Sequence, residues 1–306
     1  MHTVFTPPII ETDCEKNIFI VATPALTTRT NGHGADSPLT TAMKNTMKKN
    51  LCKIICLLVC LTLYAPASAS DQDDDLFQYA TINGLLHGLY DGNLSFADLA
   101  THGDLGLGTF NHLDGEMVAL DGRFYQIKMD GTAYPVDPSR KTPFAVVTWF
   151  DVDRKDVLPE GLDYQSLQKV LDQLITNRNH FYAFRIPARL KTITVRSVPA
   201  QTPPYPPLAE VVKEEAKFHY ENIEGTLVGF YTPDYMKGLN VPGYHFHFLN
   251  NAHTRGGHVL SLTTESGTIE VDEVNEITML LPDSRAFAEA PLGGDRKKAL
   301  EQVEKQ

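Results

Sequence analysis

The stretch Ile82-Asn-Gly84-Leu-Leu86-His-Gly88-Leu-Tyr90 recurs as Ile223-Glu-Gly225-Thr-Leu227-Val-Gly229-Phe-Tyr231, with five identities at a constant offset of 141. Residues 115–118 match residues 257–260 at an offset of 142. Similarity at a fixed offset is typical of duplicated units, although two β-rich stretches can also resemble each other by chance. We therefore predict the α+β class: two related β-rich domains with mixed sheets and a few helices.

Local patterns predict where helices and strands lie in these units. Apolar residues at helical spacing indicate a helix over 164–175, a second is predicted over 208–218, and Ser95 has the position of an N-cap for a short helix through Leu99. Asp121-Gly122 indicates a hairpin between two strands. The predicted strands cover residues 116–120, 124–127, 144–150, 181–186, 192–195 and 259–262.

The N-terminal part has the pattern of an export signal. Four lysines, Lys44, Lys48, Lys49 and Lys53, form a basic region before an apolar run over 54–64, and Ala67-Ser68-Ala69 supplies the small residues that a signal peptidase needs. The run is shorter than the roughly 20 residues that span a bilayer. We predict a signal peptide over 43–69 that is cleaved near Ala69, preceded by an unstructured upstream extension over 1–42.

The remaining chain is predicted to form two domains. Residues 197–208 contain five prolines, which is typical of a rigid connection. We place an N-terminal α+β domain at 70–200, a linker at 201–208 and a C-terminal α+β domain at 209–306. The net charge of −11 argues against nucleic acid or an anionic membrane as partner. No cysteine follows residue 60, so metal ligands there must be oxygen or nitrogen atoms.

Gly243-Tyr244-His245-Phe246-His247-Phe248 is the strongest candidate for a functional site. In a strand, side chains two residues apart point to the same face, so His245 and His247 would lie together. His258 follows a Gly-Gly turn and can fold back beside them. Three imidazoles with an open position suit Zn²⁺ or a similar ion. The alternative is that these histidines are ordinary strand residues.

Two further residues are candidates for the same site. Glu116 occupies the place that His258 takes in the second half of the repeat, so the domains could bring it to a metal between them. It could equally be an exposed strand residue after a turn. Arg196 ends a β-like run just before the linker, and a guanidinium there can hold a carboxylate with two hydrogen bonds. The alternative for Arg196 is an ordinary surface position.

Several of these segments, in the same order, closely resemble α-acetolactate decarboxylases. The matching stretches are His102-Gly-Asp-Leu-Gly-Leu-Gly-Thr109-Phe, Leu113-Asp-Gly-Glu116, Asp121-Gly-Arg-Phe-Tyr-Gln-Ile127, Val195-Arg196-Ser197, Gly225-Thr-Leu-Val-Gly-Phe230, Gly243-Tyr-His-Phe-His-Phe248 and Arg255-Gly-Gly-His-Val259. The resemblance covers nearly the whole chain after the signal peptide. It implies a two-domain α+β fold with Zn²⁺ held by His245, His247 and His258.

The resemblance also implies the reaction and further site residues. The implied enzyme is a carboxy-lyase of acetoin biosynthesis that converts 2-acetolactate to acetoin and CO₂ through a Zn-stabilised enediolate. It implies functional roles for Glu116, Arg196 and Thr109. A C-terminal tail would bring a glutamate to the metal, which we map to Glu304, with Glu301 one helical turn away as the alternative.

Other classes of function remain open at this stage. A cupin-like metal oxygenase or isomerase also uses two histidines on one strand, but no glutamate follows them in residues 248–252. A non-catalytic, metal-dependent carboxylate-binding module would bind its ligand without releasing CO₂. We expect a small-molecule substrate, no nucleic acid, no membrane contact after signal cleavage, and export to the periplasm or medium. A homodimer is compatible with the edge strands of such a protein.

Overall fold

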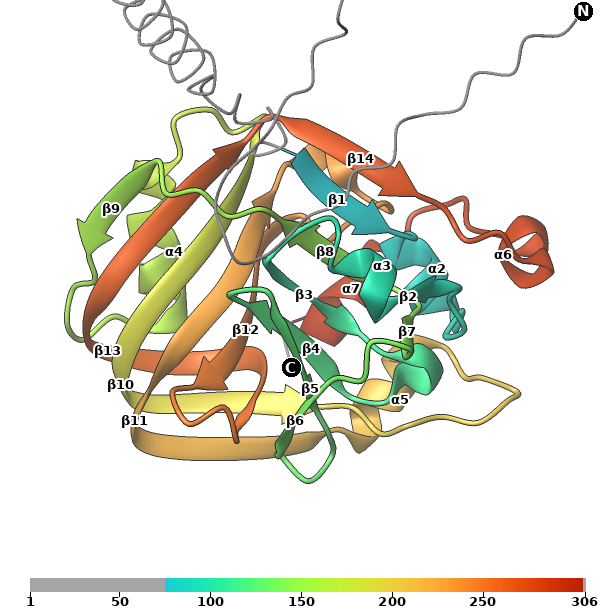
Figure 1. Ribbon diagram of the computed structural model, residues 1–306, viewed down its shortest axis with the longest axis horizontal. Helices are drawn as coiled ribbons and strands as arrows, with labels where there is room; N and C mark the ends of the chain where they lie inside the picture. Colours follow the sequence, from blue (N-terminus) through green and yellow to red (C-terminus); the bar gives the residue numbers. More distant parts are fainter. Residues whose placement is uncertain (1–74, 305–306) are drawn as a thin grey trace, which may run out of the picture. The chain divides into compact units, whose positions relative to one another are not determined.

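The computed structural model of the protein describes residues 75–304 (Figure 1). The strands are β1 (Asp75–Tyr79), β2 (Leu94–Ser95), β3 (Leu105–Thr109), β4 (Glu116–Leu120), β5 (Arg123–Ile127), β6 (Ala133–Pro135), β7 (Lys141–Thr142), β8 (Ala145–Thr148), β9 (Arg154–Val157), β10 (Phe181–Ser197), β11 (Ala216–Thr232), β12 (Gly243–Asn250), β13 (Gly256–Val274) and β14 (Glu276–Leu280). The helices are α2 (Ile82–His87), α3 (Phe96–Leu99), α4 (Tyr164–Leu174), α5 (Leu208–Val211), α6 (Arg285–Glu289) and α7 (Lys297–Glu304), with 3₁₀ turns η1 (Asn111–Leu113), η2 (Val212–Glu214) and η3 (Asp234–Met236).

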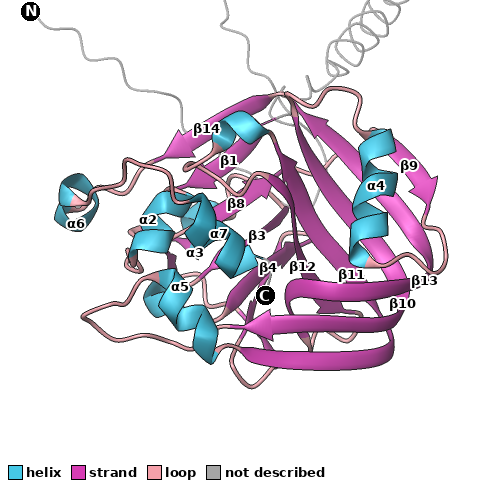
Figure 2. Ribbon diagram, turned by 180° about the vertical axis from the view of Figure 1, so that it is seen from behind, coloured by secondary structure: helices cyan, strands magenta, loops and turns pink. Residues whose placement is uncertain are grey.

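Two larger sheets dominate this part of the chain. A seven-stranded sheet has the order β14-β1-β8-β3-β4-β5-β6, and its outermost pair, β1 and β14, is parallel. A five-stranded sheet has the order β10-β11-β12-β13-β9. Because β10 also pairs with β13, the second sheet closes on itself. Figure 2 shows the strands forming most of the structure, with α4 against the long strands and the other helices on the opposite side. The predicted β-rich α+β class with mixed sheets and few helices is confirmed.

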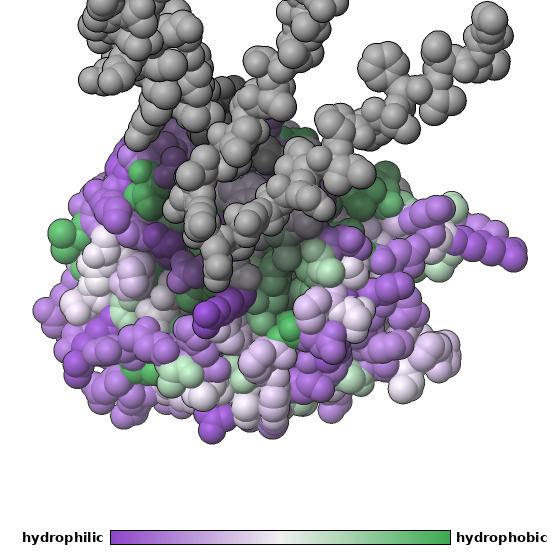
Figure 3. Space-filling view, viewed as in Figure 1, coloured by the Kyte–Doolittle hydropathy of each residue, from purple (hydrophilic) through white to green (hydrophobic). Residues whose placement is uncertain are grey.

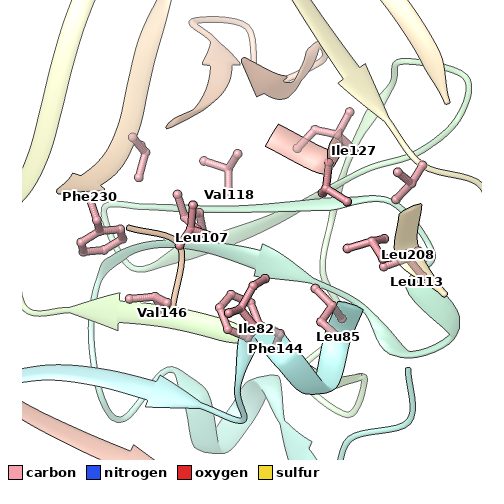
Figure 4. Close-up of a cluster of buried hydrophobic side chains, with 14 of the residues drawn as sticks. Ile82, Leu85, Leu107, Leu113, Val118, Ile127, Phe144, Val146, Leu208 and Phe230 are labelled. Carbon is pink, nitrogen blue, oxygen red and sulfur yellow. The ribbon is translucent and has the colours of Figure 1, made fainter. Parts of the chain in front are cut away.

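The apolar side chains form separate clusters on the two sides of each sheet. One cluster joins the two sheets and contains Val118 and Val146 from the first sheet and Phe230 from the second (Figure 4). Another lies on the other face of the second sheet, where α4 contributes Leu167 and Leu171. Since neighbouring residues of a strand face opposite sides, each long strand contributes to two environments. The space between the sheets is therefore lined by apolar side chains from both of them.

Most local predictions agree with the structure, and one is partly wrong. Helix α4 begins at Tyr164, with Asp163 as its N-cap, and Ser95 caps α3 by accepting a hydrogen bond from Asp98 N. The hairpin between β4 and β5 turns at Asp121 and Gly122, which both have positive φ. The helix predicted over 208–218 ends much earlier, because α5 and η2 stop at Glu214 and strand β11 begins at Ala216.

The two copies of the sequence repeat have different structures. Residues 82–87 form helix α2, whereas residues 223–231 lie within strand β11. In the first copy, Thr81 caps the helix by accepting from Gly84 N, and Gly88 ends it with a φ of 97°. In the second, Gly229 lies in the sheet under the ring of Phe246, where a Cβ would come within 2.3 Å. The interpretation of this stretch as a structural repeat is wrong. Gly88 ends a helix in the first copy, whereas the matching Gly229 allows close packing within a strand in the second.

The sheets do not follow the predicted boundary near residue 200. β9 and β10 precede that boundary and belong to the five-stranded sheet, and β14 follows it and joins the seven-stranded sheet. The division into domains at 70–200 and 209–306 stays a prediction. The upstream extension, the signal peptide and all four cysteines lie outside the described residues. None of the helices within 75–304 is long and apolar enough to cross a membrane.

The surface shown in Figure 3 is hydrophilic over most of the area that is not covered by grey atoms, and hydrophobic residues are visible beside the grey atoms and at smaller separate places.

Candidate metal centre

Three histidines from two neighbouring strands lie together. His245 and His247 are two residues apart on β12, and His247 pairs directly with His258 on β13. One ligand atom from each ring lies within 4.8 Å of the others, and His245 Nε2 is 3.0 Å from His258 Nδ1. Nitrogens that share a tetrahedral zinc ion lie about 3.3 Å apart. The predicted cluster is present, and it has the donor types and spacing that a metal ion needs.

A hydrogen bond fixes the orientation of the middle imidazole. His247 Nδ1 donates to the carbonyl oxygen of Met117 at 2.7 Å, which leaves Nε2 with its lone pair. Met117 belongs to β4 of the other sheet. The seven-stranded sheet therefore orients a ring that is carried by the five-stranded sheet. Histidines that bind metals commonly donate their other ring N–H to such a carbonyl oxygen.

Two carboxyl groups approach the histidines from different elements. Glu116 begins β4, and its Oε2 lies 3.7 Å from His247 Nε2. Glu304 ends α7, and its Oε2 lies 3.7 Å from His258 Nε2 and 3.9 Å from His245 Nε2. Glu301, the alternative considered from the sequence, is exposed and lies 3.9 Å from Lys297. Of these two glutamates, the structure brings Glu304 to the cluster.

Arg196 and Thr109 line the same pocket. Arg196 lies on β10 opposite His258 of β13, and Arg196 is only 3% exposed. Its Nε has no hydrogen-bond partner among residues 75–304. Thr109 pairs with Glu116 across β3 and β4, and its hydroxyl donates to the carbonyl oxygen of Gly115 at 2.7 Å. The structure therefore brings all seven candidate residues from the sequence to one cavity.

Burial controls the ionisation of the pocket. Burial lowers the pKa of His245 to about 3, and it lowers the pKa of His247 and His258 well below their usual range; the Arg196 charge acts in the same direction. The imidazoles are therefore neutral at pH 7, which is the form that binds metals. Burial also raises the pKa of Glu116 and of Glu304 to about 7, against the lowering effect of Arg196. These two carboxyl groups can gain or lose a proton near neutral pH.

Apolar side chains complete the walls of the cavity, whose volume is about 40 Å³. No local pattern indicated these wall residues, which come from α2, η1, the residue before β8, the residue after β10, α5 and α7. They are Ile82, Leu85, Leu113, Phe144, Val198, Leu208 and Val303.

Glu215, which forms a buried ion pair with Arg196, was not predicted from the sequence. It lies in the region that was predicted as a helix, and nothing in the residues around it indicates a partner on another strand.

The fold and the pocket define a class: an α+β protein of two β-sheets with a buried three-histidine site that can bind a metal ion. Residues 76–294 match the family model of alpha-acetolactate decarboxylase. An alpha-acetolactate decarboxylase of Methylococcus capsulatus is 48% identical over 233 residues, which cover 76% of this chain and 90% of that protein. The relative of the same name from Methanosarcina mazei is 46% identical over 78% of this chain and 83% of its own length. This chain belongs to the alpha-acetolactate decarboxylase family.

A solved structure agrees with this assignment. The crystal structure of alpha-acetolactate decarboxylase from Bacillus subtilis strain 168 superimposes with a TM-score of 0.74 at 36% identity and covers 76% of this chain and all of that one. The family-model match ends at residue 294, so α7 with Glu304 follows the matched region. The cupin-like interpretation finds no support in these comparisons.

Proposed function

We propose that this protein is a carboxy-lyase that converts 2-acetolactate to acetoin and CO₂. The observation that carries the proposal is the composition of one buried pocket in a member of this family: three neutral imidazoles, one guanidinium and two carboxyl groups. Relatives up to 48% identical are named alpha-acetolactate decarboxylase. The pocket offers groups that can bind the metal, hold the substrate carboxylate and transfer a proton.

Zn²⁺ is the metal that best fits the three histidines. Borderline-soft imidazole nitrogens suit zinc, and three protein ligands leave a position for substrate. His245, His247 and His258 would hold the ion. When bound, zinc supplies Lewis-acid stabilisation of the negative charge that develops on the substrate oxygens.

Arg196 is proposed to bind the substrate carboxylate. It is the cationic side chain among the residues that line the pocket, and its buried Nε lacks a protein partner within the described chain. A guanidinium can hold a carboxylate by two charge-assisted hydrogen bonds and so fix the direction of the bond that breaks. When the C–CO₂ bond breaks, its electron pair stays on the remaining fragment, which then takes up one proton to give acetoin.

Glu116 and Glu304 are proposed to manage that proton. Without a metal, burial raises the pKa of each to about 7, so each can hold a proton and give it up near neutral pH. Both carboxyl groups lie within 4 Å of the imidazoles, where they can also bind the metal or its water. Thr109 is proposed to hold the turn before Glu116 in place through its hydrogen bond to Gly115.

The test is turnover of racemic 2-acetolactate, followed as acetoin and CO₂, by purified protein before and after chelation and after return of Zn²⁺. Chelator-sensitive acetoin formation that zinc restores is the expected result. His247→Ala should remove activity and metal, whereas the matched change at an exposed histidine outside the pocket, His219→Ala, should leave both intact. Carboxylate binding by a folded, zinc-loaded protein without CO₂ release would instead favour the binding-module alternative.

The cellular setting belongs to the same proposal. The residues at 43–69 support export with cleavage near Ala69, which N-terminal sequencing of the mature protein would test. Self-association as a homodimer is supported by exposed apolar residues on and after the edge strand β14, namely Ile277, Leu280 and Leu281. Light scattering of the purified protein would show a single-chain mass if this part of the proposal is wrong.

A further inference from the structure

Glu215 is a buried acid beside the pocket, and the proposed reaction assigns it no role. It follows η2 and has extended backbone angles, with φ of −63° and ψ of 147°. Its side chain and that of Arg196 are each only 4% exposed, and Arg196 Nη1 donates to Glu215 Oε2 at 3.2 Å. Burial of a carboxylate is costly unless a partner compensates it. The position is therefore tied to the arginine.

The strand register explains why these side chains meet. Arg196 of β10 pairs with His258 of β13 on one side and with Lys217 of β11 on the other. Directly paired residues point to the same face of a sheet. Glu215 precedes Lys217 by two residues in extended chain, so it also points to that face. Arg196 thus lies between the three-histidine cluster and Glu215.

Glu215 holds one particular nitrogen of the guanidinium. A guanidinium is planar, so an acceptor fixed at Nη1 restricts the plane and the direction of the remaining N–H groups. Arg196 Nε, on a different edge of that plane, is buried and has no hydrogen-bond partner among the described residues. The other oxygen of Glu215 lies 3.1 Å from Nζ of Lys217, whose side chain is half exposed. Oε2 of Glu215 thus accepts a hydrogen bond from Arg196, whereas Oε1 contacts Lys217 through charge alone and has no hydrogen-bond partner among the described residues.

We propose that Glu215 is a positioning residue that orients Arg196 so that its Nε edge receives the substrate carboxylate. This inference rests on the proposed function, because it assigns Arg196 to carboxylate recognition. A purely structural ion pair would affect every ligand of the pocket equally. A positioning role affects ligands that carry a carboxylate and spares those that lack one.

The experiment compares two ligands in Glu215→Gln. 2-Hydroxyisobutyrate carries a hydroxyl and a carboxylate and lacks the ketone needed for decarboxylation, whereas acetoin has no carboxylate. In zinc-loaded protein, we expect the dissociation constant of 2-hydroxyisobutyrate to rise about tenfold, or about 1.4 kcal/mol, with that of acetoin within twofold of the unmodified protein. KM for 2-acetolactate should rise by a factor similar to that for the dissociation constant of 2-hydroxyisobutyrate. Zinc content should not change. The matched control is Glu214→Gln, the same change at the exposed neighbouring acid, which should alter neither constant.

The outcomes separate this inference from the proposed function. The positioning role is overturned if Glu215→Gln leaves both dissociation constants unchanged, or if it raises both by the same factor. If Glu215→Gln does not fold, Glu215→Asp keeps the charge on a shorter side chain, and it must show the same contrast between the ligands. Absence of acetoin formation by the unmodified protein would refute the proposed function alone, since calorimetry measures both dissociation constants without turnover.

Discussion

Gly257→Ala should damage the metal centre through the backbone. Gly257 has a φ of 143°, which L side chains rarely adopt, and a Cβ there would lie 2.4 Å from the carbonyl oxygen of Arg196. Because Cβ contacts under 3.0 Å do not occur in practice, β13 must move from β10 by at least the missing 0.6 Å. The next residue is His258. Its displacement exceeds the tolerance of about 0.2 Å in metal–ligand distances.

The expected magnitudes follow from strain and overpacking. An unfavourable backbone conformation costs about 1–3 kcal/mol, and forcing atoms into a packed interior costs about 1–3 kcal/mol. We expect the free energy of unfolding, measured in urea with chelator present, to fall by the sum of these two costs, about 2–6 kcal/mol. We expect zinc affinity, measured by competition with a chromophoric chelator, to fall about 10–100-fold, as when outer-shell support of a ligand is lost.

The matched control for this change is Gly293→Ala. A Cβ at Gly293 has no neighbour within 4 Å, and its φ is not positive. It should keep both zinc affinity and unfolding free energy. Wild-type zinc affinity in Gly257→Ala, together with a stability loss below about 1 kcal/mol, would refute the reasoning from strand separation.

Three other substitutions test the pocket and the second sheet. His245→Ala should remove zinc and acetoin formation together, as measured by metal analysis and product assay, and a fully active variant without metal would contradict the ligand assignment. Arg196→Met should keep zinc but lower kcat/KM for 2-acetolactate about 100-fold, the effect of two lost charge-assisted hydrogen bonds; unchanged kcat/KM would exclude the proposed role. Burial acts to raise the pKa of Glu270, but hydrogen bonds from Lys155 and Arg185 outweigh it, so the net pKa is below its ordinary 4.5. The stabilisation is present above pH 4.5 and lost as the pH falls below it. Glu270→Gln should therefore lower the free energy of unfolding by about 1 kcal/mol at pH 7, and its urea unfolding curve should converge with that of wild type in acid. A difference that does not depend on pH would contradict this linkage.

Local chemistry in the sequence was sufficient to predict several elements and the histidine cluster. Alternation along a strand places His245 and His247 on one face whatever the rest of the fold does. The Asp121-Gly122 turn and the cap at Ser95 depend only on neighbouring residues. These features are predictable because each is decided within about one turn or one hairpin of chain.

Features that depend on distant partners were not predictable in the same way. Gly88 ends a helix while Gly229, its match in the apparent repeat, lies under an aromatic ring contributed by another strand. Glu215 is defined by an arginine on another strand. Glu304 could be distinguished from Glu301 only after the orientation of α7 was known. In each case a long-range contact decides the role, and the local sequence does not contain that partner.

The parallel pairing of β1 with β14 has a consequence for the timing of folding. Asp75 pairs with Glu276, so the partner of the first described strand is made about 200 residues later. At ordinary synthesis rates this interval lasts about 10–40 s. During that time the edge of β1 has no β14 to pair with, and such an edge can pair wrongly with other chains. The last stage of folding must therefore follow synthesis of nearly the whole described chain, so that this sheet edge is completed late.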